Sequence, residues 1–258
     1  MKSRKERLDV LVVERGLAES RAKAQALILA GQVVVDDQRV DKPGAQVLVE
    51  AELRLKGEVL PYVSRGGLKL KAAMDRFGLD VRGKVAADIG ASTGGFTDCL
   101  LQEGATHVHA IDVGYGQLHE KLRTDPRVRS RERVNARYLT AEDLPESVEV
   151  VVIDVSFISL TQVLPAVLPY LKPGGLLVAL VKPQFEVGPD RVGKGGVVRD
   201  VAARQEAIDS VSAFVREQGL SVRGVMDSTV PGPAGNVEAL LVADKPVQAP
   251  SRSGRGRG

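Results

Sequence analysis

The stretch VAADIGASTGGFTDCLL, residues 85–101, places a glycine-rich turn between an apolar run and a segment of helical character. Ligands of open α/β sheets bind beyond the carboxyl ends of the strands, so a turn at this place is where a cofactor would bind. Gly90, Gly94 and Gly95 would let the backbone approach a ligand closely, and the following helix offers free amides. The turn lacks the middle glycine of G-x-G-x-x-G and the Gly-Lys-Ser/Thr of a phosphate-binding loop. A ligand other than a dinucleotide or a nucleotide phosphate is therefore indicated.

An acidic residue ends the next apolar run. Asp112, in AIDVGYGQL, follows the turn by about 20 residues, the spacing at which an acid accepts hydrogen bonds from ribose hydroxyls. The strand, the turn and the acid together favour a nucleoside cofactor. The alternative interpretation is that Asp88 and Asp112 are ordinary polar residues at strand ends.

Short apolar runs alternate with helical patterns from residue 84 onward. This alternation predicts an α/β domain with a Rossmann-like, mostly parallel sheet that is covered by helices on both faces. The late runs LSVRGVMDSTV and NVEALLVAD have only a short connection and predict an antiparallel hairpin at the sheet edge, as in methyltransferase-type sheets. The expected strands are KVAADIG, THVHAIDVG, VEVVVIDVSF and GLLVALVKP, and the expected helices lie near 95–103, 116–122, 160–171 and 201–218.

Composition limits the class of protein. The chain has 258 residues, 43% of them hydrophobic, enough to bury a large core. No apolar run approaches the roughly 18 residues of a membrane-spanning helix, and MKSRKERLDV carries charges where a signal peptide is apolar, so we expect a cytoplasmic protein without a membrane partner. Cys99 and the histidines, His107, His109 and His119, lack zinc-ligand spacing, and we expect no metal site.

The first 60 residues predict a separate small α+β module. Ser20 suits a helix N-cap and Gly31 a helix end, and the runs QVVV and QVLVEAELRL follow as strands. Seven Lys/Arg stand against four Asp/Glu up to residue 24, so one face can be positive and contact RNA phosphates, unless the charges only solvate the surface. The cations expected to contact RNA are Arg4, Lys5, Arg7, Arg15, Arg21 and Lys23.

Glycine and proline in KGEVLPYVSRGG, residues 56–67, interrupt any regular pattern and indicate a linker. We predict an N-terminal domain at 1–60, a linker at 61–67, a second domain at 68–246 and a disordered basic tail at 247–258.

Charged residues follow two strands of the predicted sheet. Asp154 ends VEVVVI and Lys182 ends LLVALV, so both should emerge at the cofactor edge, while Lys69 lies on a predicted helix before the sheet and Glu238 begins the last strand. Each of these residues alone would be interpreted as a surface charge or as a member of an ion pair. Together they indicate a site that orients and deprotonates a nucleophile without a metal. We assign activation of the nucleophile to a neutral Lys182 and positioning of the nucleophile to Lys69. Asp154 and Glu238 would orient the two lysines.

Three patterns resemble known families. RLDVLVVERGLAESRAKAQALILAGQVVV resembles the S4 RNA-binding domain over about residues 7–60. The order Lys69, Asp154, Lys182, Glu238 resembles the tetrad of the FtsJ/RrmJ-like ribose 2′-O-methyltransferases. DIGASTGGF resembles motif I of S-adenosylmethionine (SAM) methyltransferases and implies SAM as the cofactor. The cofactor-binding residues would be Asp88, Gly90, Ala91, Ser92, Gly94, Gly95, Phe96 and Asp112.

Together with YVSRGGLKL, IDVSFISL, LVKPQFEVG and VGKGGVVRD, these patterns make the chain similar to the TlyA family to about residue 245. The resemblance implies 2′-O-methylation of cytidine ribose in ribosomal RNA, with rRNA or ribosomal subunits as the partner. The linker LPYVS lacks the tryptophan associated with that family, so an interdomain switch that uses it is not expected.

Two other functions compete with this one. A noncatalytic RNA-binding factor for ribosome assembly would keep the fold, but the intact four charges favour an enzyme. A pore-forming hemolysin would need an inserting segment, and the sequence offers no obvious one. The loop at 183–199 either closes over RNA or is a flexible connector, and Phe185 is expected to pack.

Overall fold

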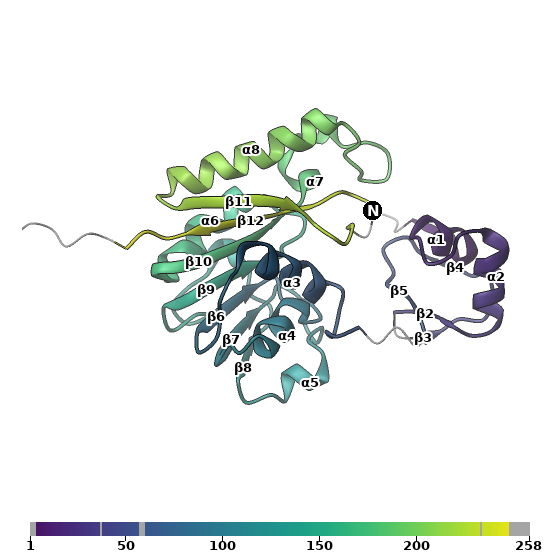
Figure 1. The fold of residues 1–258 in the computed structure, drawn as a ribbon, viewed down its shortest axis with the longest axis horizontal. Helices are drawn as coiled ribbons and strands as arrows, with labels where there is room; N and C mark the ends of the chain where they lie inside the picture. Colours follow the sequence, from purple (N-terminus) through teal and green to yellow (C-terminus); the bar gives the residue numbers. More distant parts are fainter. Residues whose placement is uncertain (1–3, 37, 57–59, 233, 248–258) are drawn as a thin grey trace, which may run out of the picture.

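The computed structural model describes residues 4–36, 38–56, 60–232 and 234–247. A small N-terminal module stands beside a larger domain built on a seven-stranded sheet (Figure 1). The predicted tail lies outside the described residues except for Val247.

The N-terminal module packs two helices on short strands. Helices α1 (Leu8–Glu14) and α2 (Arg21–Leu29) cover strands β1 (Lys5–Arg7), β2 (Val33–Val35), β3 (Gln38–Arg39), β4 (Gln46–Leu48) and β5 (Leu53–Leu55). Ser20 caps α2 as predicted, because its Oγ accepts from Lys23 N at 3.3 Å. The predicted single strand over 46–55 is wrong: β4 pairs with β1 and β5 pairs with β2, so the chain turns between them.

The large domain confirms the α/β prediction. Its strand order is β11-β12-β10-β9-β6-β7-β8, with β6 to β10 parallel and β12 antiparallel to both of its neighbours. The strands are β6 (Val85–Ile89), β7 (His107–Ile111), β8 (Val128–Arg131), β9 (Val148–Ile153), β10 (Leu171–Val181), β11 (Ser221–Asp227) and β12 (Ala239–Asp244). The final hairpin lies at the sheet edge as predicted, whereas β8 was not predicted, because its sequence VRSR is polar.

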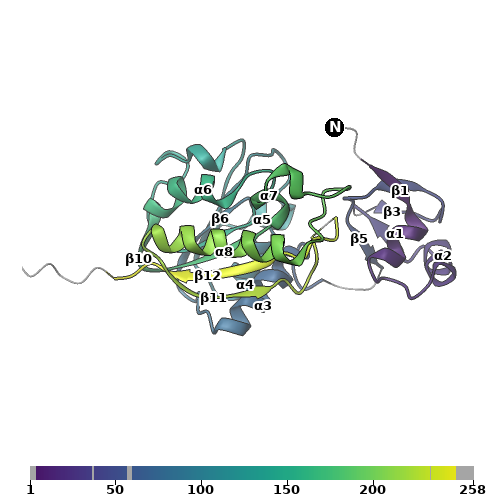
Figure 2. The same ribbon diagram turned by 90° about the horizontal axis from the view of Figure 1, so that it is seen from above.

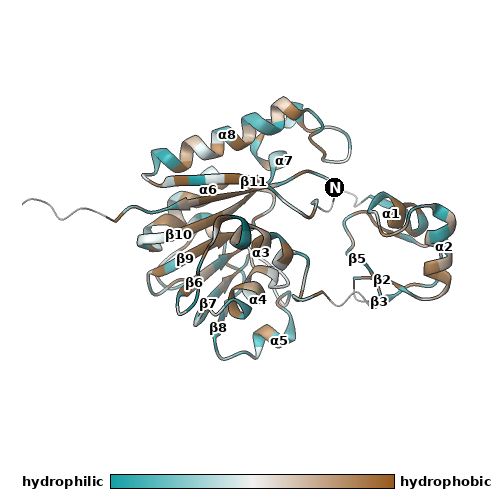
Figure 3. Cartoon of the chain, in the orientation of Figure 1, coloured by the Kyte–Doolittle hydropathy of each residue, from teal (hydrophilic) through white to brown (hydrophobic). Residues whose placement is uncertain are grey.

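Helices cover both faces of this sheet (Figures 1 and 2). Helices α3 (Gly66–Phe77) and α4 (Gly95–Gln102) pack on one face, and α6 (Leu160–Val167) and α8 (Val201–Glu217) pack on the other. Figure 3 shows hydrophobic residues concentrated in the strands between them. The short helices are α5 (Glu120–Arg123), α7 (Pro183–Glu186), η1 (Ala136–Tyr138), η2 (Leu168–Tyr170) and η3 (Pro189–Arg191).

The start of one predicted helix and the end of the predicted linker need correction. Helix α5 begins at Glu120 and not near 116, because Gly116 has a φ of +67° and His119 caps the first turn through Lys121 N. Helix α3 begins inside the predicted linker, at Gly66. The linker is held on α4, since Val63 N donates to Asp98 Oδ2 at 2.9 Å and Gln102 Nε2 donates to Pro61 O at 2.8 Å.

Candidate functional site

The glycine turn after β6 is packed tightly against its neighbours. Gly90 has a φ of +85°, and a side chain there would collide with the backbone carbonyl of Asp154. Gly94, with a φ of +97°, begins α4, and a side chain there would collide with Leu122. A side chain at Gly95 would meet the linker. The glycines are therefore required by close packing of the turn, beyond the approach to a ligand that the sequence suggested.

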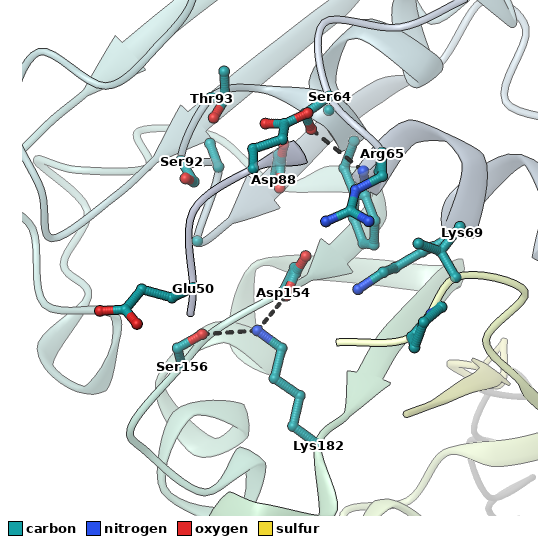
Figure 4. A pocket seen from close by; sticks show the side chains of 18 of the residues that line it. Glu50, Ser64, Arg65, Lys69, Asp88, Ser92, Thr93, Asp154, Ser156 and Lys182 are labelled. Atoms are coloured by element: carbon teal, nitrogen blue, oxygen red, sulfur yellow. Dashed lines mark hydrogen bonds and ion pairs between the residues drawn. The ribbon is translucent and has the colours of Figure 1, made fainter. Parts of the chain in front are cut away.

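Two connected hollows lie at the carboxyl edge of the sheet, with volumes of about 380 Å³ and 430 Å³. They share Gly90, Ser92, Asp154 and Ser156, so they form one cleft. The first hollow carries charged side chains from α3 and from the residues that directly follow β9 and β10 (Figure 4). The second is walled mainly by apolar residues, which are Ile111, Val113, Val134, Ala136, Val155, Phe157, Ile158 and Val163.

Asp112 stands in the second hollow. Its Oδ1 accepts from Gly114 N at 2.6 Å and its Oδ2 accepts from Ser92 N at 2.8 Å. These two bonds fix the carboxylate between the glycine turn and the loop after β7. Each oxygen keeps a further lone pair for a ligand hydroxyl, as a ribose requires.

Asp88 is fully buried below the turn. Its Oδ2 accepts from Thr97 Oγ1 at 2.6 Å, and its Oδ1 has no hydrogen-bond partner among the described residues. Burial away from water, with a smaller contribution from the nearby Asp154 charge, raises the pKa of Asp88 to about 7. The fold therefore keeps a carboxyl in an unfavourable environment at this point.

The four predicted charges form two ion pairs. Lys69 Nζ on α3 donates to Glu238 Oε2 at 2.6 Å, and the Glu238 side chain is fully buried. Lys182 Nζ, after β10, lies 2.6 Å from Asp154 Oδ1, after β9. Lys69, Asp154 and Lys182 line the first hollow and converge in Figure 4. Alternating charges hold both lysines extended toward the cleft.

Buried oxygens without a hydrogen bond are found near this cleft, although one of them, Asp154 Oδ1, is ion-paired with Lys182. Among the described residues, four buried side-chain atoms lack a hydrogen bond, and three of them belong to Asp88, Asp154 and Glu238. The fourth is Gln184 Oε1, two residues beyond Lys182. A buried polar atom without a partner costs about 1–3 kcal/mol, so such a cluster indicates a place where a ligand or substrate completes the bonding.

Phe157 is a site residue that the sequence reading missed. Its side chain is 90% exposed, and its φ of +65° is unusual for a bulky residue. It lines the second hollow beside Ser156 and packs against Phe185 with ring centroids 5.1 Å apart. The motif IDVSFISL contains Phe157, but in the sequence this residue cannot be told from an aromatic residue of the core. Only its exposure in the structure distinguishes the two. Phe185 packs, as expected.

The six N-terminal cations are not equally free. Arg7 Nε and Arg21 Nη2 each bond to Asp9 at 2.9 Å. Arg15 donates to the carbonyls of Val49 and Ala51. Arg4 lies 3.7 Å from Glu6, while Lys5 and Lys23 are exposed. Contact of these residues with RNA stays a prediction.

The described residues show neither a metal site nor a membrane-spanning helix. They contain no cluster of His, Cys, Asp and Glu suited to a metal ion. None of the helices in the described ranges has the length and apolar character needed to cross a membrane.

Comparison with known families defines the class. The FtsJ-like methyltransferase family matches residues 62–245, and the S4 domain family matches residues 6–53. A methyltransferase domain that carries an S4 domain at its N-terminal side accounts for both parts of the chain.

Three relatives narrow this class. The chain is 50% identical over 242 residues to YqxC of Bacillus subtilis, a presumed rRNA methyltransferase, covering 93% of this chain and 86% of the relative. It is 47% identical over 240 residues to the 16S/23S rRNA (cytidine-2′-O)-methyltransferase TlyA of Mycobacterium tuberculosis, covering 93% and 90%. The solved structure of a presumed hemolysin from Streptococcus thermophilus matches with a TM-score of 0.78 and 46% identity, covering 97% and 93%. The chain therefore belongs to the TlyA family of FtsJ-like methyltransferases.

Proposed function

We propose that this protein binds SAM in the cleft and transfers the methyl group to the ribose 2′-hydroxyl of a cytidine in ribosomal RNA. The observation that carries the proposal is the pair of ion pairs, Lys69–Glu238 and Lys182–Asp154, at the carboxyl edge of the sheet beside the glycine turn. The TlyA relative at 47% identity is named for this reaction.

The cleft fits SAM in chemical type. The apolar second hollow suits an adenine, and Asp112 offers acceptors to the ribose hydroxyls. The amino-acid end would lie toward the first hollow, where Asp88 Oδ1 and the start of α4 offer an acceptor and free amides. SAM, when bound, supplies a methyl group on a positively charged sulfur, so the protein has no need of a metal to activate the donor.

The residues of the chain act on the nucleophile. A ribose hydroxyl attacks efficiently only as its proton leaves, and Lys182 in its neutral form can accept that proton at Nζ. Asp154 holds Nζ at the cleft and stabilises the ammonium that results. Lys69, fixed by the buried Glu238, donates to the hydroxyl oxygen and orients it.

Transfer from SAM carrying a radiolabelled methyl group tests this function. Purified 16S and 23S rRNA and the intact ribosomal subunits are each incubated with the enzyme, and the label is mapped by resistance of the modified linkage to alkaline hydrolysis. The expected product is one or more 2′-O-methylcytidines. Label on a base, or no label on any RNA while SAM binds, would overturn the assignment.

A further inference from the structure

The edge of the sheet farthest from β11 carries a basic and aromatic surface that the function above does not use. Strand β8 and the segment after it form the sequence VRSRERVNARY, residues 128–138. We define the β8 surface as Arg129, Arg131, Arg133 and Arg137 together with Tyr115 and Tyr138, all of them exposed.

The arginines of the β8 surface make no ion pair within the part of the chain that the structure describes. Among the described residues, no carboxylate pairs with any of the four, whereas their neighbour Arg127 is bound by Asp125 at 2.7 Å. The nearby acids have other partners, since Glu132 Oε1 accepts from Gly116 N and Glu146 Oε1 lies 2.9 Å from His109 Nε2. The surface therefore keeps a net positive charge.

Two of the arginines lie against tyrosine rings. Arg133 Cζ is 4.2 Å from the centroid of Tyr115, and Arg137 Cζ is 5.6 Å from that of Tyr138. The rings stay 69% and 66% exposed, so each has area left for a second flat group. Stacking of bases on aromatic rings beside guanidinium groups is how proteins hold unpaired nucleotides. Open ring faces beside unpaired guanidinium groups match the bases and the phosphates of RNA together, so we take unpaired RNA as the occupant.

The surface borders the cleft. Its segments continue into Val113, Gly114, Val134 and Ala136, which line the second hollow, and that hollow shares Asp154 and Ser156 with the first.

We infer that the β8 surface binds the RNA that flanks the target nucleotide, with phosphates on the arginines and unpaired bases on Tyr115 and Tyr138. The inference rests on the proposed function and adds a second RNA contact, in the methyltransferase domain itself.

Substitution tests the β8 surface in the full chain. The four-fold variant R129Q/R131Q/R133Q/R137Q should bind an rRNA fragment at least a hundredfold more weakly at low salt, and its salt slope should fall by about 2 to 4. The control R76Q/R82Q/R216Q/R223Q removes the same charge from exposed arginines elsewhere and should leave both quantities near those of the parent. Y115A and Y138A should each weaken binding about tenfold without changing the slope.

Three outcomes separate the ideas. An unchanged affinity and slope in the four-fold variant would overturn the β8 surface, whatever the parent methylates. Loss of binding to intact subunits but not to protein-free rRNA would also overturn it, in favour of a protein partner. If the parent methylates no RNA but the variant still loses affinity, the β8 surface stands and the proposed reaction fails. SAM affinity, measured by calorimetry, should be equal in all variants.

A second inference rests on a different observation, the contacts of Lys182. Nζ donates to Ser156 Oγ at 2.8 Å, whereas Asp154 Oδ1, although 2.6 Å away, is not aligned for a hydrogen bond. Ser156 is thus the one described hydrogen-bond acceptor of this amine. Charge holds Lys182 near Asp154, but direction comes from the serine hydroxyl (Figure 4).

The orientation of the Lys182 amine matters because a neutral amine has a single lone pair, which must point at the proton that it accepts. When one N–H is fixed on Ser156, rotation about the Cε–Nζ bond is restricted and the lone pair can be held toward the substrate hydroxyl. We propose that Ser156 is a positioning residue that acts through Lys182, a role that rests on the proposed function.

A double-mutant cycle tests Ser156. S156A should slow single-turnover transfer about tenfold while SAM and RNA affinities stay unchanged, and S156T, which keeps an acceptor hydroxyl at this exposed position, should recover most of the rate. In a K182A background S156A should cause no further loss. A parental rate in S156A, an S156T as slow as S156A, or additive losses with K182A would each overturn the role. A failure of K182A itself to slow transfer would instead count against the proposed chemistry.

Discussion

Two buried aspartates, one in each part of the molecule, have opposite surroundings. Asp9 in the N-terminal module is fully buried, and its oxygens accept from Arg7, Arg21 and Gln25. Asp88 in the large domain is equally buried, but within the described ranges its Oδ2 accepts from Thr97 and its Oδ1 has no hydrogen-bond partner. The cations hold the pKa of Asp9 far below its usual range, while burial raises that of Asp88 to about 7.

This contrast distinguishes scaffold from site. A buried charge whose bonds are all made within the chain contributes to the fold, and its partners are less available to a ligand. A buried polar atom without a partner lowers the stability of the free protein, and its presence is explained when a bound molecule supplies the missing bond. Four substitutions test this division, ordered by the size of the expected effect.

The largest effect is expected at Lys182. Lys182→Ala should reduce single-turnover methyl transfer by about 10²- to 10⁴-fold with SAM and RNA binding retained, because the hydroxyl loses its proton acceptor. Lys182→Arg keeps the charge but does not release its proton near neutral pH, so it should be equally inactive. The matched control is Lys172→Ala, which breaks the Lys172–Glu149 pair between β10 and β9 at the opposite end of the strand that Lys182 follows. This variant should be fully active. Partial recovery in the arginine variant would assign Lys182 a purely electrostatic role.

Asp88→Asn should stabilise the protein in the absence of SAM. Because the folded carboxyl has a pKa near 7 and the unfolded one near 3.8, the free energy of unfolding of the parent falls as pH rises between these values and is lowest above pH 7. The asparagine side chain does not ionise, so the free energy of unfolding of the variant does not fall in this way. At pH 8 the variant should be more stable than the parent by up to about 4 kcal/mol, and at pH 3 the difference should vanish. Denaturant unfolding at both pH values measures it. A variant less stable than the parent at pH 8 would place Asp88 with the scaffold.

The fold could be predicted from the sequence where one physical signal dominates. The apolar runs that became β6, β7, β9 and β10 are buried on both faces, so they stand out as continuous hydrophobic segments. Strand β8 could not be found in this way, because an edge strand with the sequence VRSR pairs through its backbone and exposes its side chains.

The site residues could be predicted by position, but their state could not. Asp154 and Lys182 follow strands whose ends must meet, so their convergence follows from topology. Whether a charge is paired depends on contacts distant in sequence, such as Lys69 with Glu238, 169 positions apart. For the same reason the sequence count of N-terminal cations did not reveal that Arg7 and Arg21 share Asp9. It also did not reveal that the arginines of the β8 surface have no acidic partner in the part of the chain that the structure describes.

Asp112→Ala tests the cofactor side of the contrast. Its carboxylate makes two backbone bonds and still has lone pairs for the ribose, so its loss should weaken SAM binding by roughly 1.5–3 kcal/mol, or ten- to a hundredfold. Calorimetric titration with SAM measures the change. The control is Asp125→Ala, which removes a carboxylate bound to Arg127 outside the cleft and should leave SAM affinity unchanged. Equal affinity in the Asp112 variant would remove it from the cofactor site.

The smallest effect is expected at Asp9, with a sign opposite to that at Asp88. Asp9→Asn should destabilise the N-terminal module by about 1–2 kcal/mol at pH 7, since charge-assisted bonds to Arg7 and Arg21 are lost but both guanidinium groups are half-exposed and return to water. Because the pKa of Asp9 is lowered in the folded state, its contribution is fully present above about pH 4 and is lost as pH falls below that value, so the two proteins should converge in acid. Hydrogen exchange of the amides in α1 and α2 reports on this module separately from the large domain. Faster exchange there at pH 7, with unchanged exchange in the sheet and unchanged SAM affinity, is the expected result. Equal exchange in variant and parent would mean that the bonds made by Asp9 do not stabilise the module. The bonding of a buried carboxylate would then no longer separate a scaffold residue from a site residue.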